Sequence, residues 1–214
     1  MRETAVGFDS KKAALEGILT TPDEFPGPYP VLVVCHSHPT LRGNMNNPIV
    51  TAICSSAVRL GIATLRFNFR GVEGSQGEFT NGEIEQDDVK AALDLVRQWP
   101  GLDKKRIALA GYSFGAAVIL NGLGKYKQAA SLALIAPPIS AVQQSRIRKD
   151  KRPKLFMVGQ NDRIVNSAEL QRTLDDISEP LQFREIPDTD HSLGGHEQEI
   201  ADRTVQFTAS VIVG

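Results

Sequence analysis

The segment GYSFG at positions 111–115 places a serine two residues from a glycine on either side. An apolar run at 107–110, typical of a buried strand, directly precedes this segment, and an apolar run at 116–120, which favours a helix, directly follows it. A nucleophilic serine at so tight a strand-to-helix turn needs neighbours that do not clash. The pattern therefore predicts that Ser113 is a nucleophile held above the edge of a sheet, where the helix N-terminus favours a developing oxyanion.

A serine hydroxyl is a weak nucleophile unless a base accepts its proton. The chain has four histidines, His36, His38, His191 and His196, of which the last two follow Ser113. In enzymes with this turn the chain order is serine, acid, histidine. His191 follows the last expected strand, in a loop that returns over the sheet edge, and is the expected base. His196 falls in the first turn of the last expected helix, where we expect a solvent-facing or capping role.

The base needs a carboxylate that fixes its tautomer and stabilises the imidazolium. Asp162 follows an apolar run at 155–158, so it is expected at the C-terminal end of a strand, on the same edge as the serine. Asp188 and Asp190 are the alternatives, because both lie next to His191 in the sequence. Adjacency along one loop does not aim a carboxylate at the correct ring nitrogen. Asp162 is therefore the expected acid, and the other two are interpreted as polar loop residues.

A tetrahedral intermediate needs two hydrogen-bond donors for its oxyanion. The backbone N–H of Phe114, directly after the serine, is the first expected donor. The second should come from the loop that follows an early central strand. That loop covers 36–43, and we choose the backbone N–H of His38, with Thr40 and Leu41 as alternatives. The two imidazoles of this loop are expected to brace it, and they lack the ligand cluster that a metal site requires.

Short strands alternate with helical patterns along the chain, and these elements must position the candidate residues. Strands are expected at 4–8, 13–20, 31–35, 62–67, 106–110, 131–136, 154–158 and 182–186. Helices are expected at 48–60, 83–99, 114–123, 166–177 and 196–213. The first two strands flank a polar turn and predict an antiparallel hairpin. The alternation that follows predicts an α/β fold with a mostly parallel sheet, covered by helices on both faces, with the strand C-termini along one edge.

Two loop regions are expected to border the site. The first is rich in glycine, at 70–77, and we expect Asn68, Arg70 and Glu73 to pin it by hydrogen bonds and ion pairs. The second, at 139–153, is long enough for one short polar helix but not for a lid domain. An open site of this kind suits small or medium acyl esters. The possible wall residues are Leu41, Met45, Phe79, Phe114 and Leu193.

Composition limits the range of functions. The 214 residues carry a net charge of −1, so no basic excess points to nucleic acid. One domain over 1–214 is expected from the length. No apolar stretch is long enough to span a bilayer, and the first residues lack a signal-peptide core. Cys35 and Cys54 form no metal or redox motif and are expected to be free, buried thiols. These features predict a cytoplasmic protein without membrane association.

The combination of motifs resembles the α/β-hydrolase superfamily, in particular a group of small bacterial hydrolases distantly similar to dienelactone hydrolase. The resemblance covers nearly the whole chain and implies that Ser113, Asp162 and His191 form a catalytic triad. Ser37 departs from the pattern, because relatives often have Gly or Pro there. Dienelactone hydrolase has a cysteine nucleophile, so its substrate is not carried over. Besides the three triad segments, the resemblance rests on CHSHP at 35–39, GNMNN at 43–47, ATLRFNFRG at 63–71 and GSQGEF at 74–79.

These features together predict a serine hydrolase without cofactor or metal, with a small-molecule ester as substrate. Carboxylesterase activity through an acyl-enzyme is the expected reaction. Thioesterase, peptidase or acyltransferase activity on the same triad remains an alternative, as does a non-catalytic interaction protein that has kept the fold. The oligomeric state is left open.

Overall fold

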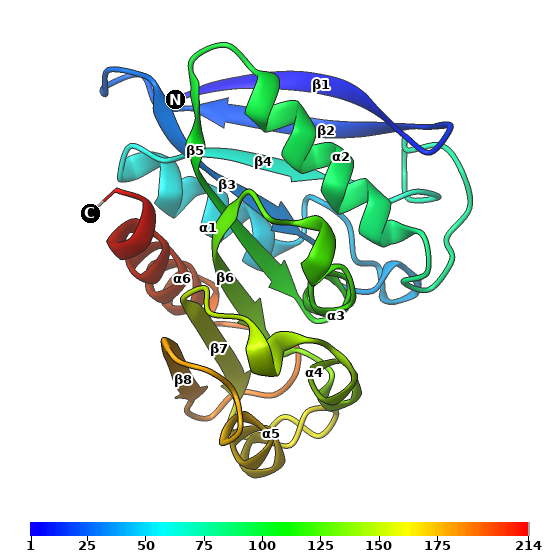
Figure 1. Cartoon of the computed structure of the whole chain (residues 1–214), viewed down its shortest axis with the longest axis vertical. Coiled ribbons are helices and arrows are strands. Elements are labelled where there is room, and N and C mark those ends of the chain that lie inside the picture. The colour runs from blue at the N-terminus through cyan, green and yellow to red at the C-terminus, as the bar shows by residue number, and fades with distance from the viewer. Residues whose placement is uncertain (214) are drawn as a thin grey trace.

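The computed structural model describes residues 1–213, and its centre is an eight-stranded sheet in the order β1-β2-β4-β3-β5-β6-β7-β8 (Figure 1). The pairs β1/β2 and β2/β4 are antiparallel, and the other neighbours are parallel. This confirms the predicted mostly parallel sheet with an N-terminal hairpin. The strands are β1 (Arg2–Ser10), β2 (Ala13–Thr21), β3 (Tyr29–Cys35), β4 (Ala63–Phe67), β5 (Leu102–Tyr112), β6 (Ala129–Ile135), β7 (Lys154–Gly159) and β8 (Leu181–Ile186).

Different helices cover the two faces of the sheet. In Figure 1, α2 crosses in front of the strands and α1 lies behind them. The central strand β3 serves both sides: Val31 and Val33 belong to the core that includes α2, whereas Leu32 and Val34 belong to the core that includes α1 and α6. This alternation explains why the strand is apolar throughout. The helices are α1 (Pro48–Arg59), α2 (Glu85–Gln98), α3 (Phe114–Asn121), α4 (Ile139–Gln144), α5 (Ser167–Leu174) and α6 (Glu197–Ile212).

Strand β5 and helix α5 differ from their predicted bounds by more than two residues, and several other elements differ by one or two. Helix α5 ends at Leu174 rather than 177. Strand β5 begins at Leu102, four residues earlier than expected, because Leu102 pairs with Tyr29 at the start of β3. Helix α3 ends at Asn121 rather than 123, because the chain tightens there into a 3-10 turn at Leu123–Lys125. None of these changes moves the elbow: β5 ends at Tyr112, two residues later than predicted, and α3 begins at Phe114 as predicted.

The segment between β6 and β7 is short, as predicted. It contains only α4 and a 3-10 turn at Ile147–Lys149. Helix α4 begins four residues after the end of β6 and lies beside the elbow helix α3 (Figure 1). Among the described residues, no lid domain covers this edge of the sheet. Within residues 1–213, no helix combines the length and the hydropathy needed to cross a bilayer.

Both cysteines are free and buried, as the sequence predicted. Cys35 ends β3, and Cys54 lies in α1. Burial raises the pKa of the Cys54 thiol to about 11, and it also raises the pKa of Cys35. Both side chains therefore remain protonated at neutral pH and act as small apolar core residues.

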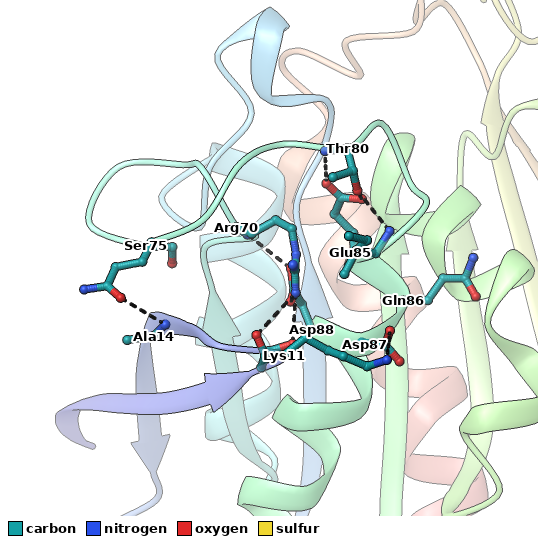
Figure 2. A network of polar contacts seen from close by, with 12 residues as sticks. Lys11, Ala14, Arg70, Ser75, Thr80, Glu85, Gln86, Asp87 and Asp88 are labelled. Atoms are coloured by element: carbon teal, nitrogen blue, oxygen red, sulfur yellow. Dashed lines mark hydrogen bonds and ion pairs between the residues drawn. The ribbon is translucent and has the colours of Figure 1, made fainter.

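Buried charges pin the loop between β4 and α2. The Arg70 guanidinium forms an ion pair with Asp88 on α2, and the side-chain exposures are 6% and 0% (Figure 2). Asn68 donates to Glu16 Oε1 at 2.6 Å, and the same oxygen accepts the N–H of Gly74 at 2.9 Å. The roles predicted for Asn68 and Arg70 agree with these contacts. Glu73 is exposed with a positive φ of 47° and has no polar contact with the described residues, so Glu16 on β2 takes the place predicted for it.

Candidate active site

Ser113 lies at the turn between β5 and α3 in a strained backbone conformation, with φ 53° and ψ −107°. Such a conformation costs about 1–3 kcal/mol and persists only where the surroundings enforce it. Close packing at Gly115 constrains the turn, because an added Cβ there would lie 2.5 Å from the carbonyl oxygen of Cys35. The missing side chain lets α3 approach the end of β3, and the turn projects the serine from the C-terminal edge of the sheet.

His191 meets the serine hydroxyl. Its Nε2 atom lies 2.9 Å from Ser113 Oγ. The loop that carries it is held by Tyr112, whose hydroxyl donates to the carbonyl oxygens of His191 at 2.9 Å and Ser192 at 3.2 Å. Burial raises the pKa of Tyr112 to about 12, so this donor keeps its proton at neutral pH. Sequence reasoning missed Tyr112. Its position directly before the serine was the one available signal.

Asp162 is the carboxylate that contacts the histidine. Its Oδ2 atom lies 2.7 Å from His191 Nδ1, and its side chain has 0% exposure. The other oxygen, Oδ1, accepts the backbone N–H groups of Ile164 and Val165, each at 2.8 Å. These bonds fix the orientation of the carboxylate. Since an ionised carboxylate only accepts, Nδ1 carries the proton and Nε2 is free to accept the serine proton.

A second close approach brings the acid loop and the histidine loop together. The acid follows the end of β7, and a Cβ added to Gly159 there would lie 2.5 Å from the carbonyl oxygen of Thr189. The N–H of Asn161 donates to the same carbonyl at 2.8 Å. The parallel pairing of β7 with β8 thus places two loops distant in sequence side by side.

The alternative carboxylates do not reach the imidazole. Asp190 is exposed and accepts the Ser192 hydroxyl at 2.6 Å and the Ser192 N–H at 2.8 Å. These bonds lower the pKa of Asp190. Asp188 is also exposed and donates its backbone N–H to Gln160 Oε1 at 3.2 Å. Both residues shape the loop that carries His191.

The candidate oxyanion donors differ in whether they are already paired. The N–H of Thr40 donates to His38 Nδ1 at 3.3 Å, and the N–H of Leu41 donates to the carbonyl oxygen of His38 at 3.0 Å. The backbone N–H groups of His38 and Phe114 have no hydrogen-bond partner within residues 1–213. The rings of these two residues lie 5.2 Å apart, so the two segments adjoin. This arrangement leaves both predicted donors available to a ligand.

The loop histidines brace their surroundings. His36 Nδ1 lies 2.7 Å from the carbonyl oxygen of Ser37, and its Nε2 accepts the N–H of Phe69 at 3.2 Å. His38 Nε2 lies 3.3 Å from Asn81 Oδ1. Within residues 1–213, no group of three or more His, Cys, Asp or Glu side chains could hold a metal ion.

The loop that presents Asn81 is itself anchored by a buried carboxylate. Glu85, at the start of α2, has 0% exposure. It accepts the Thr80 hydroxyl at 2.7 Å, the Thr80 N–H at 2.6 Å and the Gly82 N–H at 2.8 Å (Figure 2). The anchored turn positions Asn81 against the imidazole of His38. A chain of contacts therefore runs from α2 to the loop that carries the second candidate oxyanion donor.

Low pH is expected to destabilise the folded protein through protonation of His36. Burial lowers the pKa of this imidazole to about 4, despite its hydrogen bond to Ser37, whereas an unfolded histidine titrates near about 6.5. The neutral ring therefore stabilises the fold fully above about pH 6.5, and this contribution is lost as the pH falls towards about 4.

Replacing the imidazole should flatten this dependence. Between about pH 7 and about pH 4.5, we expect His36→Gln to lose about 2 kcal/mol less free energy of unfolding than the wild type. Urea unfolding at both pH values measures the two losses. Equal losses in the two proteins would contradict this role of His36, whatever the overall stability of the variant.

A cavity of about 340 Å³ opens at Ser113 and His191. Leu41 and Phe114 line it, as predicted. Three other predicted wall residues do not. Met45 and Leu193 are buried, and Phe79 packs with its ring centroid 5.3 Å from that of Phe114. Position relative to a cavity depends on tertiary packing, which the local sequence does not encode. The full lining is His38, Leu41, Asn81, Gly82, Ser113, Phe114, Ala117, Val118, Asn121, Pro138, Ser140, Ala141, Gln144, Ile164 and His191.

Known proteins share this fold and sequence pattern. The family model of the alpha/beta hydrolase domain matches residues 33–211. An uncharacterized protein of Rickettsia prowazekii is 32% identical over 170 residues, covering 76% of this chain and 71% of the relative. An α/β serine hydrolase without lid from Xanthomonas campestris has a TM-score of 0.84 at 29% identity, with 98% of this chain and 94% of that chain covered. An α/β serine hydrolase homologue from Coxiella burnetii has a TM-score of 0.81 at 30% identity, with 96% and 97% covered.

Proposed function

The chain belongs to the α/β-hydrolase family, and on that premise we propose that this hydrolase is a serine carboxylesterase that acts through Ser113, His191 and Asp162. One observation carries the proposal: hydrogen-bonding contacts connect Asp162 to His191 and His191 to Ser113, and the last two residues line the cavity. The likeness to two serine hydrolase structures at 29% and 30% identity supports the same reaction class.

In the proposed mechanism, the first half-reaction forms an acyl-enzyme. His191 Nε2 accepts the proton of Ser113 Oγ while that oxygen attacks the ester carbonyl carbon. The buried Asp162 carboxylate stabilises the imidazolium that forms. The N–H groups of Phe114 and His38 donate to the oxyanion of the tetrahedral intermediate. When this intermediate collapses, the alkoxide leaves and takes the proton from His191 as an alcohol.

The second half-reaction returns the enzyme to its starting state. A water molecule enters from the open side of the cavity, and His191 Nε2 accepts its proton as the oxygen attacks the acyl carbon. The second tetrahedral intermediate uses the same two oxyanion donors. The acid is released when Ser113 regains its proton. No step requires a group other than the side chains and backbone named here.

The proposal predicts hydrolysis of activated esters, which a substrate panel measures. We expect p-nitrophenyl butyrate to be cleaved with a kcat/KM well above the rates for an acyl thioester and a p-nitroanilide of the same acyl group. Preincubation with a chelator is expected to leave the rate unchanged, because the mechanism involves only protein groups. A preference for the thioester or the anilide would replace the carboxylesterase assignment by another reaction of the same triad. Loss of activity that zinc or manganese restores would contradict the mechanism.

A further inference from the structure

The cavity at Ser113 continues between α3 and α4, which lie side by side (Figure 1). This α3–α4 groove is lined by Ala117, Val118, Asn121, Ala141 and Gln144. The residues at 113, 117 and 121 recur every four positions and therefore share one face of α3. The groove leads from the nucleophile to the Asn121 amide along about 12 Å of helix.

The walls of the groove are small, apolar and uncharged near the serine. Alanines face it from both helices, Ala117 from α3 and Ala141 from α4, and the buried Val118 completes this apolar lining. Among the described residues that line the cavity, none is Asp, Glu, Lys or Arg. A charged group bound there would lose its hydration without a partner, which is costly. The middle of the groove therefore suits an uncharged chain.

The far end of the groove is polar. Asn121 and Gln144 are both exposed and offer amide donors and acceptors. Beyond this amide pair lies a second hollow of about 500 Å³, which shares both residues and is also lined by Lys125 and Arg146. The Lys125 ammonium is already paired with Asp87 at 2.8 Å. The two leucines of this second hollow, Leu120 and Leu123, are buried, so an alkyl chain gains little apolar contact past the amide pair, whereas a hydroxyl there finds hydrogen-bond partners.

The position of the base indicates which part of an ester enters the groove. In the proposed mechanism, His191 Nε2 delivers a proton to the leaving oxygen, so the alcohol portion lies on the histidine side of Ser113. The acyl portion then extends to the other side of the serine. We therefore assign the acyl chain to the groove, which starts at Ser113 and follows α3.

We propose that the α3–α4 groove selects esters with an uncharged, medium-length acyl chain that ends in a hydrogen-bonding group such as a hydroxyl. A span of about 12 Å corresponds to an extended chain of about nine carbon–carbon bonds. This assignment rests on the proposed function, because it places the acyl carbon at Ser113. It adds a substrate class that the reaction type alone does not specify.

Acyl-chain profiles test the length of the groove. With p-nitrophenyl esters, kcat/KM of the wild type is expected to rise from acetate to octanoate or decanoate and to rise no further at tetradecanoate. Ala117→Leu, which fills the groove midway, should lower the octanoate-to-acetate ratio about tenfold or more. Thermal unfolding verifies that the variant is folded. Ala91→Leu, on a half-buried alanine of α2 outside the groove, is the matched control and should leave the ratio unchanged. An octanoate-to-acetate ratio that Ala117→Leu leaves unchanged overturns the proposal. The proposal is also overturned if Ala117→Leu changes only the dependence of kcat/KM on the length of the alcohol chain.

A matched pair of esters tests the polar end. The wild type should prefer ω-hydroxyoctanoate over octanoate by about two- to tenfold, the range that one solvent-accessible hydrogen bond provides. The double variant Asn121→Leu, Gln144→Leu should remove or reverse this preference, and thermal unfolding verifies that the variant is folded. An ester with a terminal carboxylate should be a poorer substrate than the hydroxyl form. Preference for that carboxylate, or a hydroxyl preference that survives the double substitution, contradicts the proposal.

A binding measurement separates this proposal from the proposed function. Calorimetry on Ser113→Ala protein should detect tighter binding of methyl ω-hydroxyoctanoate than of methyl octanoate, and weaker binding after Ala117→Leu is added. If the variant binds with this pattern but the wild type hydrolyses no ester, the groove assignment stands and the esterase function is overturned. Ester hydrolysis without this pattern, in catalysis and in binding, keeps the esterase and overturns the groove.

Discussion

Replacement of Ser113 by alanine is expected to lower kcat on p-nitrophenyl butyrate by on the order of 10⁶, the scale seen when a triad nucleophile is removed. The loss follows because no other hydroxyl lies at the meeting point of His191 Nε2, the cavity and the two free N–H groups within residues 1–213. The residual rate should come from direct attack of water on the bound ester, with the oxyanion donors still in place.

Steady-state kinetics on purified proteins measure this loss, and thermal unfolding verifies that the variant is folded. Ser210→Ala is the matched control, because the Ser210 hydroxyl lies on α6 and donates to the carbonyl oxygen of Phe207. It should retain the wild-type rate. A folded Ser113→Ala protein with activity within tenfold of the wild type would overturn the assignment of the nucleophile.

Asp162→Asn is expected to lower kcat by up to ~10⁴, the scale known for the equivalent change in a serine protease. An asparagine can still accept the N–H groups of Ile164 and Val165 through its oxygen, so the loop should keep its shape. Its amide group then faces His191 Nδ1 as a donor. This arrangement favours the tautomer with the proton on Nε2, which cannot accept the serine proton.

The neighbouring aspartates provide the controls for this prediction. Asp188→Asn and Asp190→Asn should each cost about tenfold or less, because their carboxylates do not contact the imidazole. Combining Asp162→Asn with Ser113→Ala should add little to the loss from the serine alone, since triad members act as a unit. If Asp190→Asn proves the crippled variant and Asp162→Asn stays near normal, the acid is wrongly assigned. The roles of Ser113 and His191 do not depend on that outcome.

The sequence allowed the central geometry to be anticipated because each part of it depends on a local signal. A glycine-flanked serine between a strand and a helix specifies the elbow. Parallel strands place their C-termini on one edge, so a residue after β7 was expected near a residue after β5. The chain order of serine, acid and histidine then narrowed the choice, and the structure brings Ser113, His191 and Asp162 into contact.

Features that depend on packing between distant segments were not predicted. Glu16 on β2 holds the loop where Glu73 was expected, because the hairpin folds back against that loop. Tyr112 holds the histidine loop through a hydroxyl whose direction no local pattern specifies. The cavity walls depend on how α3 and α4 pack. Leu193 was expected to be a wall residue, but it has 0% exposure and does not line the cavity. Sequence periodicity reports which side chains are buried, but not which cavity an exposed side chain faces.

The central claim is that Ser113 is the nucleophile activated by His191, and covalent labelling tests it most directly. The wild-type protein should react with an alkyl fluorophosphonate, and tandem mass spectrometry of the digested product should find one adduct, on Ser113. Ser113→Ala should not react, and His191→Ala should react far more slowly because the hydroxyl has lost its base. An adduct on a different residue, or labelling that persists in folded Ser113→Ala protein, would contradict the account.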